Sequence, residues 1–109
     1  MLKRDYREQV LGTILPRIQT PGQYLGGEPN SVRKDHREVE GTLCLAFPDT
    51  YALGMSHHGL QVLYSLMNAR NWACERVFTP LPDFEQALRE RGWPLYGLET
   101  FTPLHEFDV

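Results

Sequence analysis

The chain has 109 residues, the size of one ordinary domain. Its hydrophobic content of 41% is enough for one core and argues against wholesale disorder. The chain has fifteen Leu but only six Val and two Ile. This composition argues against an all-β fold, because strands favour β-branched residues. The net charge of −3 argues against a general nucleic-acid binder, which usually carries a basic surplus.

The charge is unevenly distributed along the chain. Residues 1–40 carry seven Lys or Arg against six Asp or Glu, whereas residues 41–109 carry four against eight. We therefore predict two segments, an N-terminal arm over residues 1–40 and a second unit over residues 41–109. No apolar run approaches the ~20 residues of a membrane span, and the N-terminus lacks the apolar stretch of a signal peptide. We expect a cytoplasmic location, with Cys44 and Cys74 as reduced, buried thiols.

The N-terminal arm opens with an amphipathic pattern. Apolar residues recur every four positions, at Leu2, Tyr6, Val10, Ile14 and Ile18, and Leu11 and Leu15 widen this stripe. The spacing predicts a helix over residues 2–15 that packs on the rest of the chain, and Pro16 should end or kink it. Residues 20–41 are rich in Gly and Pro and then in charges of mixed sign, which predicts a long loop.

The second unit has an α/β pattern. The apolar run 42–47 fits a strand covered on both faces, as in a parallel sheet. Ser56 is a good N-cap for a helix that ends near Asn71. The apolar positions of this helix are Leu60, Leu63, Tyr64, Leu66 and Met67.

A second strand, a further helix and an extended piece follow. Residues 73–78 read as the strand, and Asp83 should cap a helix that ends at Gly92. The inward positions of that helix are Phe84, Ala87 and Leu88. After the extended residues 94–98, residues 107–109 start like a third strand. The order is that of a right-handed β-α-β unit truncated at its third strand, which indicates a piece of a longer protein. We expect its open sheet edge and the N-terminal apolar stripe to cause self-association.

Ligands of open α/β sheets bind beyond the carboxyl ends of the strands, which here means residues 48–59. The helix start in this segment offers backbone amides that could cradle a phosphate or an amide-bearing ligand. The simpler interpretation, that Gly54 is a turn glycine and Ser56 a cap, stays open. His57 and His58 are neighbours that point in different directions, so we expect no metal site. Glycine fingerprints of dinucleotide and P-loop sites are absent.

Two runs of residues in this region resemble a known family. Residues 23–34 (QYLGGEPNSVRK) and 45–59 (LAFPDTYALGMSHHG) are similar to the N-terminal region of cobalamin-binding-type radical S-adenosylmethionine (radical SAM) proteins. The similarity continues through residues 75–80, 83–92 and 94–109, and so covers nearly the whole chain. The resemblance implies an α/β fold, a partial Rossmann-like three-layer unit of the cobalamin-binding type, preceded by the helical arm and long loop.

The resemblance also implies a division of labour. In such proteins a barrel with a three-cysteine motif holds a 4Fe–4S cluster and S-adenosylmethionine, and two cysteines are too few for that cluster. We therefore expect this chain to be a non-catalytic cofactor-binding-type fragment, whose partner is the radical SAM barrel of the parent chain. The fragment itself would hold cobalamin or keep the fold without it.

A motif difference bears on the cobalamin. Ligating corrinoid domains carry Asp-x-His-x-x-Gly after the first strand, and this chain has Asp49-x-Tyr51-x-x-Gly54. A phenol is a poor cobalt ligand beside an imidazole, so we expect no protein imidazole on cobalt, with Tyr51 shielding the lower face, or else a vestigial pocket. The cofactor-binding residues implied are Asp49, Tyr51, Gly54, Met55, Ser56, His57 and Gly59.

Two other function classes are weighed against this interpretation. The loop from Tyr24 to Arg37 combines an aromatic with the basic residues Arg33, Lys34 and Arg37. These could grip an RNA backbone or a protein, although the net charge counts against RNA. A thiol enzyme using Cys44 is the other alternative, although a Cys inside an apolar strand is usually a core residue.

Overall fold

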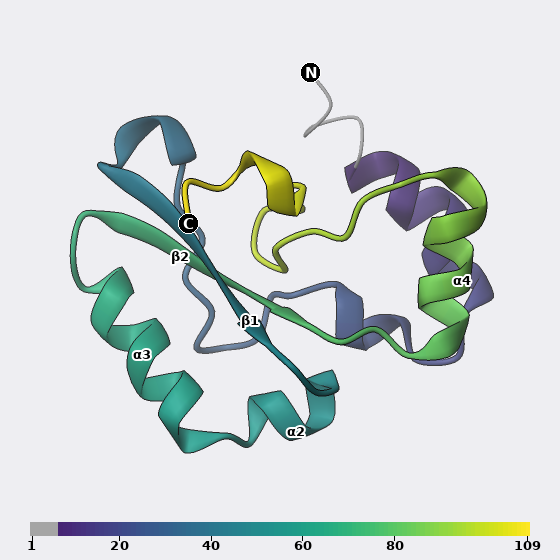
Figure 1. The fold of residues 1–109 in the computed structure, drawn as a ribbon, viewed down its shortest axis with the longest axis horizontal. Coiled ribbons are helices and arrows are strands. Elements are labelled where there is room, and N and C mark those ends of the chain that lie inside the picture. Colours follow the sequence, from purple (N-terminus) through teal and green to yellow (C-terminus); the bar gives the residue numbers. More distant parts are fainter. Residues whose placement is uncertain (1–6) are drawn as a thin grey trace.

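The computed structural model describes residues 7–109, in which a small parallel sheet is surrounded by helices and ordered loops (Figure 1). The main elements are β1 (Gly41–Phe47), α2 (Tyr51–Met55), α3 (His58–Asn68), β2 (Trp72–Phe78) and α4 (Pro82–Arg91). Short turns of other helix types complete them: the π-helix η1 (Val10–Ile14) and the 3₁₀ turns η2 (Leu15–Arg17), η3 (Pro21–Tyr24), η4 (His36–Glu38) and η5 (Leu104–Glu106). This mixture of helices and a parallel sheet is compatible with the predicted α/β class.

β1 and β2 pair in parallel, in register from Gly41 beside Trp72 to Phe47 beside Phe78. The end of the chain lies on the other side of β1. The amide of Val109 donates to the Thr42 carbonyl at 3.1 Å, and the Cys44 amide donates to the Val109 carbonyl at 2.9 Å. Val109 thus bonds to Thr42 and Cys44, the two neighbours of Leu43, and this is the hydrogen-bond pattern of parallel strands. β1 therefore lies between β2 and the segment that ends at Val109.

The outer edge of β2 is covered by the loop that follows α4. The Leu98 amide donates to the Arg76 carbonyl at 2.9 Å, and the Glu99 carboxylate accepts from the Arg76 amide at 3.1 Å. A loop that satisfies the edge groups of a strand blocks pairing with another chain there.

The helix predicted after β1 is divided in two. Residues 51–55 form α2, which the sequence did not predict, and α3 begins only at His58. The N-cap of α3 is His57, whose Nδ1 accepts from the Leu60 amide at 3.1 Å, so the predicted cap Ser56 was wrong. The Ser56 hydroxyl instead donates to carbonyls of α2 at its C-terminal end. By contrast, α4 ends at Gly92 with φ of 66°, as predicted.

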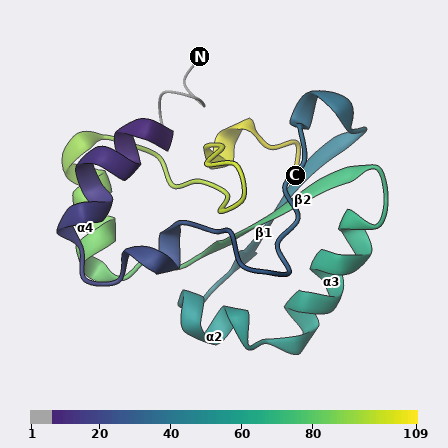
Figure 2. The same cartoon turned by 180° about the vertical axis from the view of Figure 1, so that it is seen from behind.

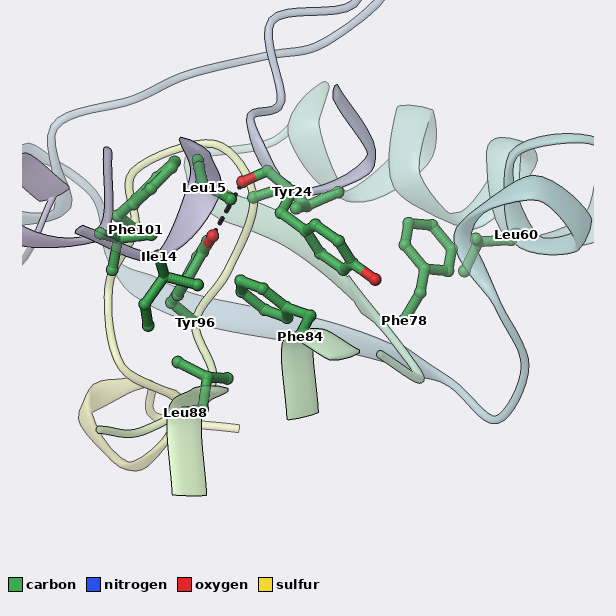
Figure 3. Close-up of a cluster of buried hydrophobic side chains, with 11 residues drawn as sticks. Ile14, Leu15, Tyr24, Leu60, Phe78, Phe84, Leu88, Tyr96 and Phe101 are labelled. Atoms are coloured by element: carbon green, nitrogen blue, oxygen red, sulfur yellow. Dashed lines mark hydrogen bonds between the residues drawn. The ribbon is translucent and has the colours of Figure 1, made fainter. Parts of the chain in front are cut away.

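The core joins the N-terminal arm to the second unit (Figure 3). Tyr24 stacks on Phe84 with ring centroids 3.8 Å apart, and the Tyr96 hydroxyl donates to the Tyr24 carbonyl at 2.9 Å. Val10 and Ile14 are buried in the same cluster, so the predicted docking of the arm is confirmed for its described part. The predicted contacts of Leu2 and Tyr6 lie outside the described residues.

The outer face of α3 is unusual for an exposed helix. Leu60 and Tyr64 are buried as predicted, whereas Leu63 and Leu66 are 53% and 58% exposed, because the helix presents only one narrow side to β2. α3 contains no Asp, Glu, Lys or Arg. None of the helices within residues 7–109 combines the length and the apolar character that crossing a membrane requires.

The buried position of Val10 gives a test of arm docking. Val10 is fully buried, so Val10→Asp places a charge in the core and should lower the melting temperature by several degrees. Leu11 in the same π-helical turn is 37% exposed, so Leu11→Asp should lower the melting temperature much less. Thermal unfolding followed by circular dichroism compares the two variants, and equal effects would contradict docking of the arm through Val10.

Self-association of the isolated chain stays a prediction, and the exposed face of α3 adds a surface for it. Changing Leu63 and Leu66 together to Lys should lower the average mass measured by light scattering at micromolar concentration, because it removes exposed apolar area. Gln86→Lys on the exposed side of α4 is the control and should leave the mass unchanged. A monomeric mass for the unaltered chain would contradict the prediction.

Candidate functional site

The carboxyl ends of β1 and β2 and the segment 48–59 form the place where an open α/β sheet takes its ligand. The Thr79 amide, just after β2, donates to the Asp49 carbonyl at 2.8 Å and ties the two strand ends together. The Asp49 side chain is exposed and accepts from the Thr50 amide at 2.8 Å. Asp49 thus shapes the turn into α2.

Tyr51, the first residue of α2, points to the long loop of the N-terminal arm. Its hydroxyl donates to Glu28 Oε2 at 2.6 Å. The other oxygen, Glu28 Oε1, accepts from the Arg76 guanidinium at 2.8 Å. Figure 2 shows the loop after η3 running along the strands on the side where α2 and α3 lie. Glu28 therefore fastens this loop to β1's carboxyl end and to β2 at once.

Arg76 is the centre of a larger buried cluster. Its guanidinium also pairs with the Glu99 carboxylate, which takes a further hydrogen bond from the Tyr64 hydroxyl at 2.8 Å. The Tyr64 ring lies under the guanidinium, 4.6 Å from its carbon to the ring centroid, as in a cation–π contact. Side chains of Arg76 and Glu99 are 3% and 1% exposed. We call Glu28, Tyr51, Tyr64, Arg76 and Glu99 the Arg76 cluster.

The pKa values in this cluster reflect burial and pairing. Burial and the neighbouring Glu28 carboxylate raise the pKa of Tyr51 to about 12. Burial acts to raise the pKa of Glu28, but hydrogen bonds from Tyr51 and Arg76 outweigh it and lower that pKa. Burial raises the pKa of Glu99, with the Arg76 guanidinium opposing it. At neutral pH, Tyr51 is thus a hydrogen-bond donor to an ionised Glu28.

The other residues implied as cofactor-binding have structural contacts. Gly54 is buried against Phe78, and a Cβ there would collide with that ring. The Met55 sulfur accepts from the Arg76 guanidinium at 3.3 Å. His57 caps α3, and its ring lies 4.9 Å from that of Phe47. Gly59 is exposed, and a Cβ there would lie close to the His57 ring.

These contacts decide how well the residues fit a corrinoid. No imidazole stands at the ligating position, because that residue is Tyr51, and its hydroxyl faces Glu28. The one nitrogen of His57 that the structure engages is bonded to the backbone of α3, and Gly54 meets a protein ring. The residues present do not fit the group.

A second buried cluster lies on the opposite face of β2. Glu75 is 1% exposed and accepts from His36 Nε2 at 2.6 Å and from the Thr100 hydroxyl at 2.7 Å. Glu75 and Arg76 were not among the site residues predicted from the sequence. The available signal was two charged residues inside a predicted buried strand, which must be paired if buried.

The two thiols are separated and inert. Cys44 lies beside Glu75 in the register, whereas Cys74 lies beside Leu43, so their side chains point to opposite faces of the sheet. Burial and nearby carboxylates raise the pKa of Cys44 and raise that of Cys74 to about 12. A protonated thiol is a poor nucleophile and metal ligand, which argues against an enzyme using Cys44. Among residues 7–109, no group of His, Cys, Asp and Glu is arranged to hold a metal ion.

The basic loop has mostly internal contacts. Lys34 Nζ donates to the carbonyls of Asn68, Arg70 and Trp72 at 2.7–2.9 Å, where the negative end of the α3 dipole lies. Arg37 pairs with Asp35 at 3.0 Å, and Tyr24 is buried. Lys34 and Tyr24 therefore hold the fold together, whereas Arg33 and Arg37 are exposed.

An open depression of about 390 Å³ lies beside α4, just past the carboxyl end of β2. Leu88, Trp93 and Leu95 give it an apolar wall, and an exposed Glu85–Arg89 pair stands at its side. It is separate from every residue that the resemblance implies as cofactor-binding.

The comparison with protein families gives one match, which covers the C-terminal part of this α/β unit. Residues 59–109 match the family model described as the N-terminal region of radical SAM proteins. This match supports an N-terminal region of a radical SAM protein over these residues. The match does not single out the cobalamin-binding kind. No curated protein and no solved structure gives a significant match to the chain.

The raised pKa of Tyr51 gives a pH-dependent prediction. The folded state keeps the Tyr51 proton between pH 10, the ordinary pKa, and about 12, while the unfolded chain loses it. Stability therefore falls as the pH rises through this window. Tyr51→Phe has no phenol to titrate, so its free energy of unfolding should fall less steeply above pH 10 than that of the unaltered chain. Urea unfolding at a series of pH values measures this. Parallel curves for the two proteins would contradict the assignment.

Proposed function

We propose that this chain is the non-catalytic N-terminal module of a radical SAM enzyme. The observation that carries the proposal is the match of residues 59–109 to the N-terminal region of that family. In this proposal the reductive cleavage of S-adenosylmethionine takes place in a barrel elsewhere in the parent chain, which is also the partner of this module.

The cysteines support the non-catalytic assignment. A 4Fe–4S cluster is held by Cys thiolates, and the radical SAM motif supplies three of them. The chain has two, Cys44 and Cys74, which lie on opposite faces of the sheet. Their raised pKa values keep them protonated at neutral pH. The same reduced thiols are consistent with a cytoplasmic protein.

The strand arrangement supports a doubly wound domain. β1 lies between β2 and the residues leading to Val109, and all the hydrogen bonds involved are of the parallel type. An order in which the first strand lies between the second and third is that of flavodoxin-like sheets, one of the two common doubly wound orders. In this proposal residues 41–109 are the first half of such a Rossmann-like domain.

Enzyme assays on the isolated chain and on the parent protein test this division. With iron, sulfide and a strong reductant, the parent should form 5′-deoxyadenosine from S-adenosylmethionine, and the isolated chain should form none. Cys44→Ala in the parent should keep this activity, because that thiol is no cluster ligand here. Product formation by the isolated chain, or its loss in Cys44→Ala while the protein stays folded, would contradict the proposal. Liquid chromatography of the nucleoside product is the measurement.

A further inference from the structure

We infer that the chain's own loop closes the carboxyl end of this sheet through Glu28, so that the module does not bind a corrinoid there. The inference concerns the cofactor of this module and stands apart from the proposed division of labour. It depends on side-chain contacts that occupy the carboxyl end of the sheet.

The first observation is the direction of Tyr51. A residue that serves the lower face of a corrinoid must be free to face the metal, as the His of ligating domains does. Here the Tyr51 hydroxyl is bonded to Glu28 at 2.6 Å, and its ring meets Phe78 edge-on with centroids 5.6 Å apart. The side chain is therefore held between a loop and a strand.

The second observation is the charge that the same loop residue neutralises. Glu28 pairs with Arg76, whose side chain is 3% exposed. A ligand that displaced Glu28 would leave a buried guanidinium short of one carboxylate, and removing one partner of a buried ion pair is strongly destabilising.

The third observation is that the loop is fixed at further points along its length. The Val32 amide donates to the Tyr64 hydroxyl at 2.6 Å, and Lys34 donates to three carbonyls between the end of α3 and the start of β2. Moving the loop aside would break these bonds together with those of Glu28. Each buried donor or acceptor left unpaired carries its own desolvation cost.

The fourth observation is the set of contacts made by Gly54 and His57. Gly54 lets Phe78 approach the backbone of α2, so a protein ring fills that space. Phe47 lies between Phe78 and His57, with centroids 6.3 Å and 4.9 Å away. His57 serves as the cap of α3. The three rings pack on one another at the strand ends.

Binding of hydroxocobalamin to the parent protein is the first test. Equilibrium dialysis and visible absorption should show no saturable binding at cobalamin concentrations well above a micromolar Kd. Saturable binding that is lost in Tyr51→Ala or His57→Ala would overturn the inference. Formation of 5′-deoxyadenosine by the same preparation is measured in parallel, so a failed proposed function is distinguished from a failed inference.

A double-mutant cycle between Tyr51 and Glu28 tests the closure itself. If the two side chains act through one hydrogen bond, Tyr51→Phe and Glu28→Gln together should shift the urea midpoint clearly less than the sum of the single shifts. Glu38→Gln, at an exposed carboxylate of η4, is the control and should add independently to Tyr51→Phe. Additive effects of Tyr51→Phe and Glu28→Gln would show that the loop is not fastened there and would overturn the inference.

Discussion

The buried positive charge of Arg76 is the constraint on which the rest of this structure depends. A guanidinium at the middle of a strand is costly to remove from water, and it is tolerated only when carboxylates and hydrogen bonds surround it. Glu28 comes from the N-terminal loop and Glu99 from the segment after α4, while Tyr64 of α3 stacks beneath. Three segments far apart in the sequence are thereby drawn to one side of β2. Loss of one partner from such a cluster typically costs about 3–5 kcal/mol, a large part of the stability of a small domain.

The residue before Arg76 repeats the arrangement on the other face of β2. Because side chains alternate along a strand, Glu75 points away from the Arg76 cluster and meets His36 and Thr100. Two segments thus contact both faces of β2, the N-terminal loop over residues 28–36 and the pair 99–100 after α4. A two-stranded sheet is marginal by itself. Here the loops complete the layers that a larger sheet would obtain from more strands and helices.

The segment after β1 has structural contacts in place of ligand contacts. It matches the pattern of a cofactor loop at Asp49 and Gly54, but Asp49 shapes a turn and Gly54 lets Phe78 approach closely. His57 caps α3, and the Tyr51 hydroxyl is bonded to Glu28. The segment after β1 is therefore held by contacts within the fold. An open depression lies beside α4, and the face of α3 without charged residues is another exposed feature of the described part of the chain.

The sequence by itself determined most of the elements, though not α2, and the resemblance to radical SAM proteins. Both strands, the amphipathic arm, the helix that ends at Gly92 and the long loop follow from local patterns, because apolar periodicity and Gly or Pro act over a few residues. Resemblance over residues 23–109 predicted the radical SAM region. The tertiary structure alone decided that Ser56 does not cap α3, that Leu63 and Leu66 are exposed, and which partners Arg76 and Glu75 have. Pairing of a buried charge is set by residues 20–50 positions away, and no local spacing records that distance. For the same reason Tyr51 could be placed at the strand end from sequence, but its bond to Glu28 could not.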